Sequence, residues 1–167
     1  MKIQAGDIIR RLNLKPLPEE GGYYSETYRS KHRLAADSLA AGFEGSHSLA
    51  TTIFYLITSE SFSRMHRLPS DEVWHFYLGD PAEQLLLFPD GTGKVVTLGN
   101  DITKGELLQS VVPALAWQGT ILKPGGSFAL FGTTVTPGFE FADYQPGSRD
   151  QLRENYQDFE AEIIKRI

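Results

Sequence analysis

Short segments rich in β-branched and aromatic residues follow one another along most of the chain, and turn residues separate them. Glycine and proline mark two of the turns, at residues 89–93 and 123–126. The ten or more residues that a helical crossover needs are missing between the segments, which argues against a parallel α/β sheet. The spacing predicts an antiparallel all-β sandwich or barrel with strands at 23–29, 49–58, 62–68, 72–78, 83–88, 94–98, 106–112, 119–122, 128–135 and 139–144.

Helical patterns are confined to the two ends of the chain. Asp7 is placed to cap a short helix with its apolar residues on one face, which Pro16 then ends. Near the other end, Ser148 and Gln151 form a capping-box pattern. We expect an amphipathic carboxy-terminal helix there, because apolar residues recur at helical spacing: Leu152, Tyr156, Phe159, Ile163 and Ile167.

Residues 30–48 are small and polar and show little periodicity. This segment predicts a surface loop in which His32 and His47 are exposed to solvent. The pattern contains no internal repeat or linker, and 167 residues suit one domain with one core. We therefore expect a single domain over residues 1–167.

Composition excludes several kinds of chemistry. The chain has no Cys, so it contains no disulfide, no cysteine nucleophile and no thiolate metal site. With 16 basic and 21 acidic residues the formal charge is −5, and no stretch has more than two basic residues in a row, which argues against a nucleic-acid partner. The amino-terminal residues lack the apolar run of a signal peptide, and no window is apolar enough to span a membrane. We expect a cytoplasmic protein with no membrane partner.

Residues 62–79 carry the densest functional signal. Because side chains alternate along a strand, His66 and Leu68 share one face of their strand, and Arg64 shares it too. Glu72 and the aromatic residues Trp74 and Phe76 share a face of the next strand, whereas His75 points the other way unless a bulge intervenes.

These residues resemble the first motif of the cupin superfamily, with His66, Glu72 and Gly79 at its characteristic places and Leu68 where a second His would stand. Residues 113–118 resemble the second motif, with Gln118 in place of its His. Residues 18–29, 65–75 and 112–118 together are similar to the cupin family of unknown function called DUF985 or cupin-5.

The resemblance implies a double-stranded β-helix, or jelly roll, that is commonly dimeric and akin to the dTDP-sugar 3,5-epimerases and seed-storage cupins. A homodimer is therefore expected. It also implies a metal site of three His and one Glu. Since Leu68 and Gln118 occupy two of those four places, we expect no cofactor and only weak capacity for a divalent metal.

The first functional hypothesis is a cavity that binds a small sugar-like or nucleotide-sugar-like ligand and isomerises or epimerises it. His66 is the candidate general base, because an imidazole titrates near neutral pH, and Glu72 is the candidate carboxylate that orients it. Arg64 is placed to hold an anionic group. The acid is not selected among Tyr55, Tyr77 and Tyr144. The expected cavity wall also includes Trp74, Phe76, Trp117 and Gln118.

Two alternatives stay open. A metal-dependent cupin enzyme, an oxygenase or isomerase, would use His66, Glu72 and Gln118, with His75 as a fourth ligand. A binding or storage module without catalysis is the other. Each candidate also has a purely structural interpretation, in which His66 is a hydrogen-bonded buried histidine, Glu72 is paired with an arginine and the aromatic residues form the core.

Overall fold

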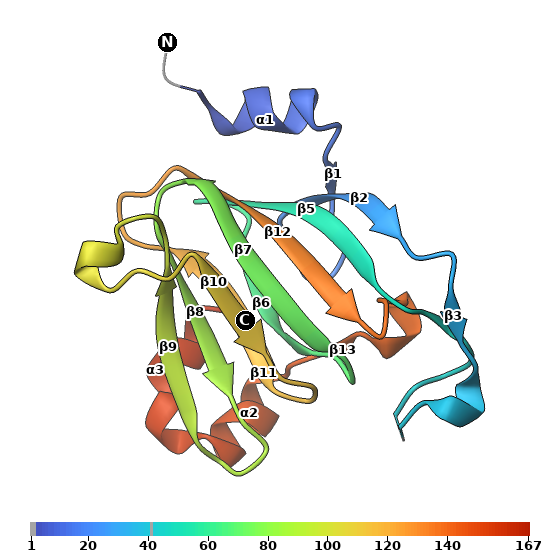
Figure 1. The fold of residues 1–167 in the computed structure, drawn as a ribbon. Coiled ribbons are helices and arrows are strands. Elements are labelled where there is room, and N and C mark those ends of the chain that lie inside the picture. Colours follow the sequence, from blue (N-terminus) through green and yellow to red (C-terminus); the bar gives the residue numbers. More distant parts are fainter. Residues whose placement is uncertain (1–2, 41) are drawn as a thin grey trace.

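The computed structural model describes residues 3–40 and 42–167 (Figure 1). Its helices and strands are α1 (Ala5–Arg11), β1 (Lys15–Pro16), β2 (Tyr23–Arg29), β3 (Arg33–Leu34), β4 (His47–Ser48), β5 (Thr51–Thr58), β6 (Ser63–Arg67), β7 (Asp71–Gly79), β8 (Ala82–Leu87), β9 (Gly93–Leu98), β10 (Gln109–Val112), β11 (Trp117–Leu122), β12 (Phe128–Thr136), β13 (Gln145–Pro146), α2 (Arg149–Asn155) and α3 (Glu160–Ile164).

Two antiparallel sheets form the body of the protein. The larger has the strand order β1-β2-β5-β12-β7-β10, and the smaller has the order β13-β6-β11-β8-β9. Neighbours such as β5 and β12 lie far apart in sequence, which is the pattern of a jelly roll rather than of a meander. The all-β jelly-roll prediction is confirmed.

The core lies between the facing sides of the two sheets. Tyr55, Trp74 and Phe131 enter it from the larger sheet, and Leu86 and Leu98 enter it from the smaller one. The three aromatic rings pack edge to face, and the centroid of the Trp74 ring lies 5.5 Å from that of Tyr55 and 5.2 Å from that of Phe131. This packing fixes which side chains of β5, β7 and β12 point inward.

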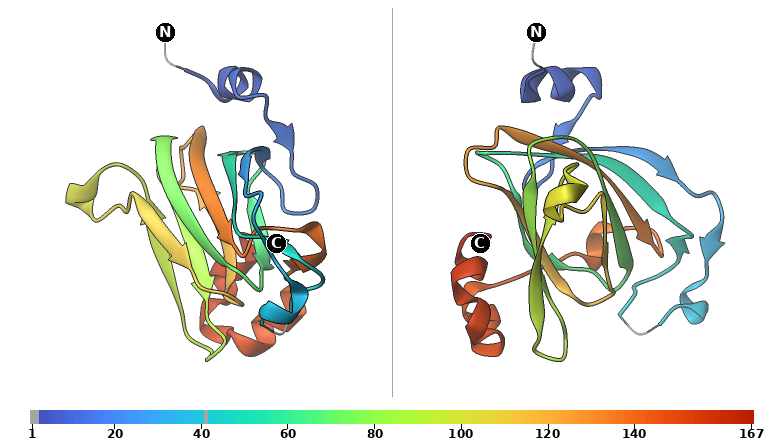
Figure 2. Two further views of the ribbon diagram at one scale, coloured as in Figure 1. Left: turned by 45° about the vertical axis from the view of Figure 1, so that its right-hand side comes forward. Right: turned by 60° about the vertical axis from the view of Figure 1, so that its left-hand side comes forward.

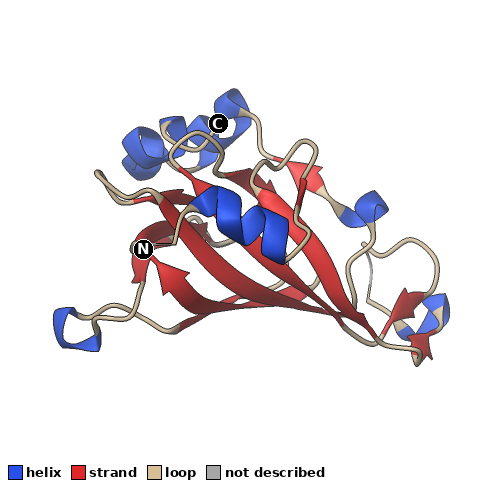
Figure 3. Cartoon of the chain, turned by 90° about the horizontal axis from the view of Figure 1, so that it is seen from above, coloured by secondary structure: helices blue, strands red, loops and turns tan. Residues whose placement is uncertain are grey.

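Helices cover the outer faces. The helices α2 and α3 pack on the smaller sheet through a second apolar cluster that includes Met65, Trp117 and Leu152 (Figures 1 and 2). Seen from above, α1 lies across the strands of the larger sheet, where Ile8 packs near Leu56 and Phe128 (Figure 3). No helix among the described residues is long and apolar enough to cross a bilayer.

Three local predictions are wrong. The first helix begins at Ala5, and Asp7 lies in its first turn, where it accepts a hydrogen bond from the Gln4 amide at 3.2 Å. Residues 139–144 form no strand, because i to i+3 hydrogen bonds close a 3-10 turn at Phe141–Asp143. The carboxy-terminal helix is interrupted at Tyr156, whose hydroxyl donates to the Phe88 carbonyl at 3.0 Å and whose backbone leaves the helical region.

The segment 30–48 also differs from the expected loop. It contains the short hairpin of β3 and β4, and His47 is fully buried instead of exposed. The imidazole Nε2 of His47 lies 2.8 Å from Oδ2 of Asp143, which is also buried. A hydrogen bond therefore ties this segment to residues 139–144. His32 is exposed, as predicted.

Candidate functional site

A cavity of about 150 Å³ lies between the two sheets. The strands β5, β6, β7 and β12 and the loop before β2 all contribute side chains to it. Its polar and charged lining residues are Glu20, Tyr24, Glu26, Arg29, Thr51, Tyr55, His66, Glu72, Trp74 and Thr133. Its apolar lining residues are Leu17, Ile53, Leu68, Val135, Phe139 and Phe141. A cavity of this volume accommodates a single six-membered ring.

His66 reaches the cavity from β6 and is 2% exposed. Its Nδ1 lies 2.7 Å from the Arg64 carbonyl oxygen, and a carbonyl only accepts hydrogen bonds, so Nδ1 carries the proton in the neutral ring. Nε2 is then the basic nitrogen, and Oε2 of Glu20 lies 3.8 Å from it. Tyr144 stacks on the imidazole with the ring centroids 5.2 Å apart. The ring is thus held in one orientation and one tautomer.

Glu72 reaches the cavity from β7 and is 6% exposed. Gln118 on β11 donates from Nε2 to Glu72 Oε2 at 2.6 Å, a hydrogen bond that joins the two sheets. Burial raises the pKa of Glu72, and the negative charge of Glu20 raises it further. His66 and the hydrogen bond from Gln118 act in the opposite direction, so Glu72 is a carboxyl group that resists ionisation.

Glu20 enters the cavity from the loop before β2, which two glycines bring close to the sheet. Gly22 has a φ of +69°, and a Cβ there would lie 2.7 Å from the Tyr55 hydroxyl. That hydroxyl donates to the Gly21 carbonyl at 2.9 Å, and Ser63 donates to Oε1 of Glu20 at 3.0 Å. Burial first, then the charge of Glu20, raises the pKa of Tyr55 well above its ordinary value.

Among the described residues, several buried polar atoms have no hydrogen-bond partner within the protein. Trp74 Nε1 and Thr133 Oγ1 belong to residues that line the cavity and are 1% and 2% exposed. Gln118 Oε1 is a third. Buried polar groups are normally satisfied, so partners from a ligand or water are expected here. The indole N–H donates only and requires an acceptor.

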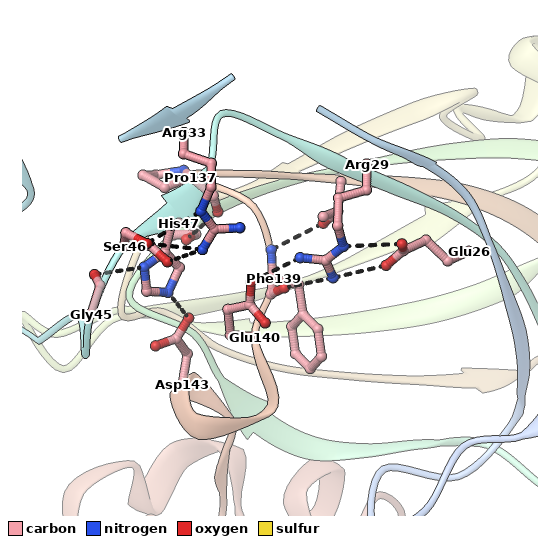
Figure 4. Close-up of polar contacts among 12 residues, drawn as sticks. Glu26, Arg29, Arg33, Gly45, Ser46, His47, Pro137, Phe139, Glu140 and Asp143 are labelled. Atoms are coloured by element: carbon pink, nitrogen blue, oxygen red, sulfur yellow. Dashed lines mark hydrogen bonds and ion pairs between the residues drawn. The ribbon is translucent and has the colours of Figure 1, made fainter. Parts of the chain in front are cut away.

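Arg29 lines the cavity, and its guanidinium is held by acidic groups (Figure 4). Glu26 accepts from Nε at 3.0 Å and from a terminal nitrogen at 2.8 Å, and Glu140 accepts from the other terminal nitrogen at 2.8 Å. The Phe139 carbonyl accepts a further bond at 3.1 Å. These contacts connect β2 to the segment that His47 and Asp143 secure.

Of the predicted site residues, the structure brings His66, Glu72 and Trp74 together in the cavity wall, and Gln118 binds Glu72 from beside it. Their chemical roles stay predictions. Tyr144 stacks on His66, and Tyr55 lines the same cavity. Tyr77 lies on the outer face of the larger sheet, where it is 49% exposed and packs edge to face with Phe54.

Gln118 lies beside the cavity, and three other predicted wall residues do not line it either. Arg64 is exposed, and its guanidinium donates to the Glu19 carbonyl at 3.0 Å. Phe76 is packed against Phe131 in the core. Trp117 faces the helices, because side chains alternate along a strand and its neighbour Gln118 faces inward. The Arg67 guanidinium lies over the Trp117 ring, 4.6 Å from the ring centroid.

Several wall residues that matter for the chemistry were not assigned to the wall in the sequence analysis, among them Glu20, Arg29, Tyr55 and Thr133. Once one residue of β5 or β12 is known to point inward, the alternation of side chains along the strand identifies Tyr55 and Thr133 as inward-facing too. The position of Glu20 depends on a tight glycine turn, and the direction of Arg29 depends on a bulge in β2 between Glu26 and Tyr28. Neither position follows from the alternation of side chains along a strand.

The donor set does not fit a cupin metal centre. No group of three or more His, Cys, Asp or Glu side chains within residues 3–40 and 42–167 is arranged to hold a metal ion. His75 points to the opposite face, where its Nδ1 lies 3.2 Å from Gln109 Nε2. Leu68 lines the cavity at the place of a metal-binding His. We therefore derive no chemistry from a metal.

Residues 6–146 match the family described as the cupin superfamily (DUF985). The chain belongs to this family, and the family prediction is confirmed.

Individual relatives support the same assignment. A hypothetical protein from Leishmania major is 34% identical to this chain, with a TM-score of 0.88, and the match covers 98% of each chain. Protein SO0799 from Shewanella oneidensis is 32% identical to this chain, with a TM-score of 0.84, and the match covers 99% of this chain and 98% of the Shewanella chain. The uncharacterised protein YML079W of Saccharomyces cerevisiae is 31% identical over 134 residues, which are 75% of this chain and 66% of the yeast protein.

More distant similarity extends to an oxalate decarboxylase of Bacillus subtilis, at 13% identity and a TM-score of 0.54 over 93% of this chain and 38% of that one. At this level of identity the similarity shows the fold alone.

Proposed function

We propose that the protein binds a small, hydroxylated, sugar-like molecule in the cavity beside His66, and that His66 exchanges a proton with it. The observation that carries the proposal is the tautomer of His66. Its Nδ1 proton is engaged by the Arg64 carbonyl, which leaves Nε2 as the basic nitrogen of a ring that lines the cavity.

The chemistry that suits these groups is isomerisation or epimerisation next to a carbonyl. Nε2 of His66 takes the proton from a carbon beside the ligand carbonyl, and the electron pair of that C–H bond moves to form an enolate. The carboxylate of Glu20, 3.8 Å away, stabilises the imidazolium that results. In isomerisation, the imidazolium returns the proton to the former carbonyl carbon while the hydroxyl proton of the first carbon moves to the enolate oxygen. In epimerisation, an acid on the opposite face supplies a proton to the same carbon, and His66 then loses its own proton to solvent. Neither route needs an external oxidant or reductant.

The unpartnered donors suit the enolate oxygen. Trp74 Nε1 and Thr133 Oγ1 are buried, belong to cavity-lining residues and lack protein partners. A donor fixed in place before the reaction stabilises developing negative charge better than mobile water does. Tyr55 and Tyr144 stand as the candidates for the acid, since Tyr77 lies on the outer face.

The cavity volume limits the ligand to about one sugar ring. A volume of 150 Å³ has no room for the nucleotide of a nucleotide sugar, which would lie outside the sheets. We therefore place a monosaccharide, rather than its nucleotide conjugate, in the enclosed part of the site.

The test compares the wild type with His66→Ala and with His32→Ala, which removes an exposed imidazole and serves as the matched control. Thermal unfolding is measured with a panel of aldoses, ketoses and amino sugars, and NMR in D₂O follows deuterium entry into the C–H next to the carbonyl. We expect stabilisation and exchange in the wild type and in His32→Ala, and neither in a folded His66→Ala.

Equal stabilisation of His66→Ala would contradict the proposed site. Stabilisation of the wild type without deuterium entry would reject the proton transfer and leave a binding module. No stabilisation by any member of the panel would reject the sugar-like ligand.

A further inference from the structure

The guanidinium of Arg29, which lines the cavity, is already paired with carboxylates. Arg29 donates four hydrogen bonds, three of them to the carboxylates of Glu26 and Glu140 and one to the Phe139 carbonyl (Figure 4). These carboxylates hold the pKa of Arg29 above its ordinary value. A ligand phosphate or carboxylate would have to displace both of them, so the guanidinium is no ready anion site.

The remaining charged groups of the cavity wall are acidic. Glu20, Glu26 and Glu72 line it, while Arg29 and His66 are its only basic groups within the described residues. Glu20 and Glu72 are close enough for the charge of one to raise the pKa of the other. An anion entering this space meets repulsion in a poorly solvated environment, whereas a cation relieves it.

Hydrogen-bonding and aromatic groups define the rest of the surface. The unpartnered Trp74 Nε1 requires an acceptor such as a hydroxyl oxygen, and the Thr133 hydroxyl accepts or donates. Aromatic rings of Tyr24, Tyr55 and Phe139 line the same cavity. Aromatic faces attract cations, and the effect is greater where water is excluded.

We propose that the cavity selects a positively charged, hydroxylated ligand of single-ring size, of the amino-sugar or cyclic amino-alcohol class, and rejects sugar phosphates and sugar acids. The ammonium group pairs with Glu20 and favours the ionised form of Glu72, and the hydroxyl groups satisfy Trp74 and Thr133. The inference rests on the proposed function in one respect, that the cavity is a binding site.

The probes are D-glucosamine, D-glucose and D-glucose 6-phosphate, which share one ring and differ in charge. Their affinities are measured by calorimetric titration at pH 7 and low ionic strength. We expect D-glucosamine to bind at least tenfold more tightly than D-glucose, and D-glucose 6-phosphate to bind at least tenfold more weakly than D-glucose.

Two variants assign the selectivity to the cavity. Glu20→Gln keeps an acceptor for Ser63 and removes the charge, so the preference for D-glucosamine over D-glucose falls at least fivefold. Glu60→Gln removes an exposed carboxylate outside the cavity and leaves the preference unchanged.

Tighter binding of D-glucose 6-phosphate than of D-glucosamine would overturn the charge selectivity while leaving the cavity as a binding site. An unchanged preference in a folded Glu20→Gln would also overturn it. Absence of binding for all three probes would overturn this inference, and the proposed function would then be judged on the wider panel and on His66→Ala.

Discussion

Arg166, next to the last residue, is fully buried and offers a test of how the site is supported. Its guanidinium donates to the carbonyls of Gly119, Glu83 and Glu162 at 3.2, 3.2 and 2.8 Å, and to the Glu162 carboxylate at 2.8 Å. Its own carbonyl accepts from the Met65 amide, beside His66. The carboxy-terminal segment therefore holds the strands that carry His66 and Gln118.

Arg166→Met keeps the aliphatic stem and deletes these four hydrogen bonds. Each buried carbonyl that loses its partner costs about 1–2 kcal/mol, and the ion pair with the partly exposed Glu162 adds about 1 kcal/mol. We expect the free energy of unfolding to fall by about 4–7 kcal/mol, a quarter or more of the ~5–15 kcal/mol typical of a domain.

Lys165→Met is the matched control. Lys165 binds the same Glu162 at 2.6 Å, but its side chain is 51% exposed, and such pairs contribute about 0–1 kcal/mol. Urea denaturation of the two variants, with similar m-values, measures the difference. A loss below about 1 kcal/mol in Arg166→Met would refute this account of the buried guanidinium.

Three further predictions follow from single contacts. His47→Ala leaves Asp143 buried without its partner and lowers the free energy of unfolding by about 2–4 kcal/mol in urea denaturation, whereas an effect below 0.5 kcal/mol would argue against the buried bond. The pKa of Glu72 is raised in the folded protein, so its protonated form stabilises the fold at low pH, and this stabilisation is lost as pH rises through the folded-state pKa. Glu72→Gln is therefore expected to be more stable than the wild type at pH 8, and the gain disappears as pH falls below about 4. A variant that is less stable than the wild type at pH 8 would contradict the direction of the pKa shift. Arg64→Ala changes the affinity for D-glucosamine less than twofold in calorimetric titration, because the guanidinium lies outside the cavity wall, and a tenfold loss would place it in the site.

Most strands could be predicted because each depends on local pattern and turn chemistry. The segment from Phe128 to Val135 is rich in β-forming residues, and successive side chains enter two different apolar clusters, Ala129 and Phe131 one and Phe128 and Leu130 the other. The structure extends this strand by one residue to Thr136. The stretch from Phe139 to Tyr144 has the same β-forming composition, yet it folds into a 3-10 turn because its long-range contacts with Arg29 and His47 determine its path.

The site was only partly predictable for the same reason. His66 and Glu72 follow from a motif and its alternation along neighbouring strands. The burial of His47 depends on Asp143, 96 residues away, which no local pattern reports. The position of Glu20 depends on the close packing of Gly22 against Tyr55, and the satisfaction of Arg29 depends on Glu140, 111 residues further along.

The tautomer and ligand response of His66 test the central claim most directly. NMR of protein labelled with ¹⁵N-histidine, assigned by the signals missing from His66→Ala, is predicted to show His66 protonated at Nδ1 and unprotonated at Nε2 at pH 8. Added D-glucosamine is predicted to shift the Nε2 signal of His66 and to leave that of the exposed His32 unchanged. A proton on Nε2 in the free protein, or a His66 signal that does not move at saturating D-glucosamine, would contradict the account.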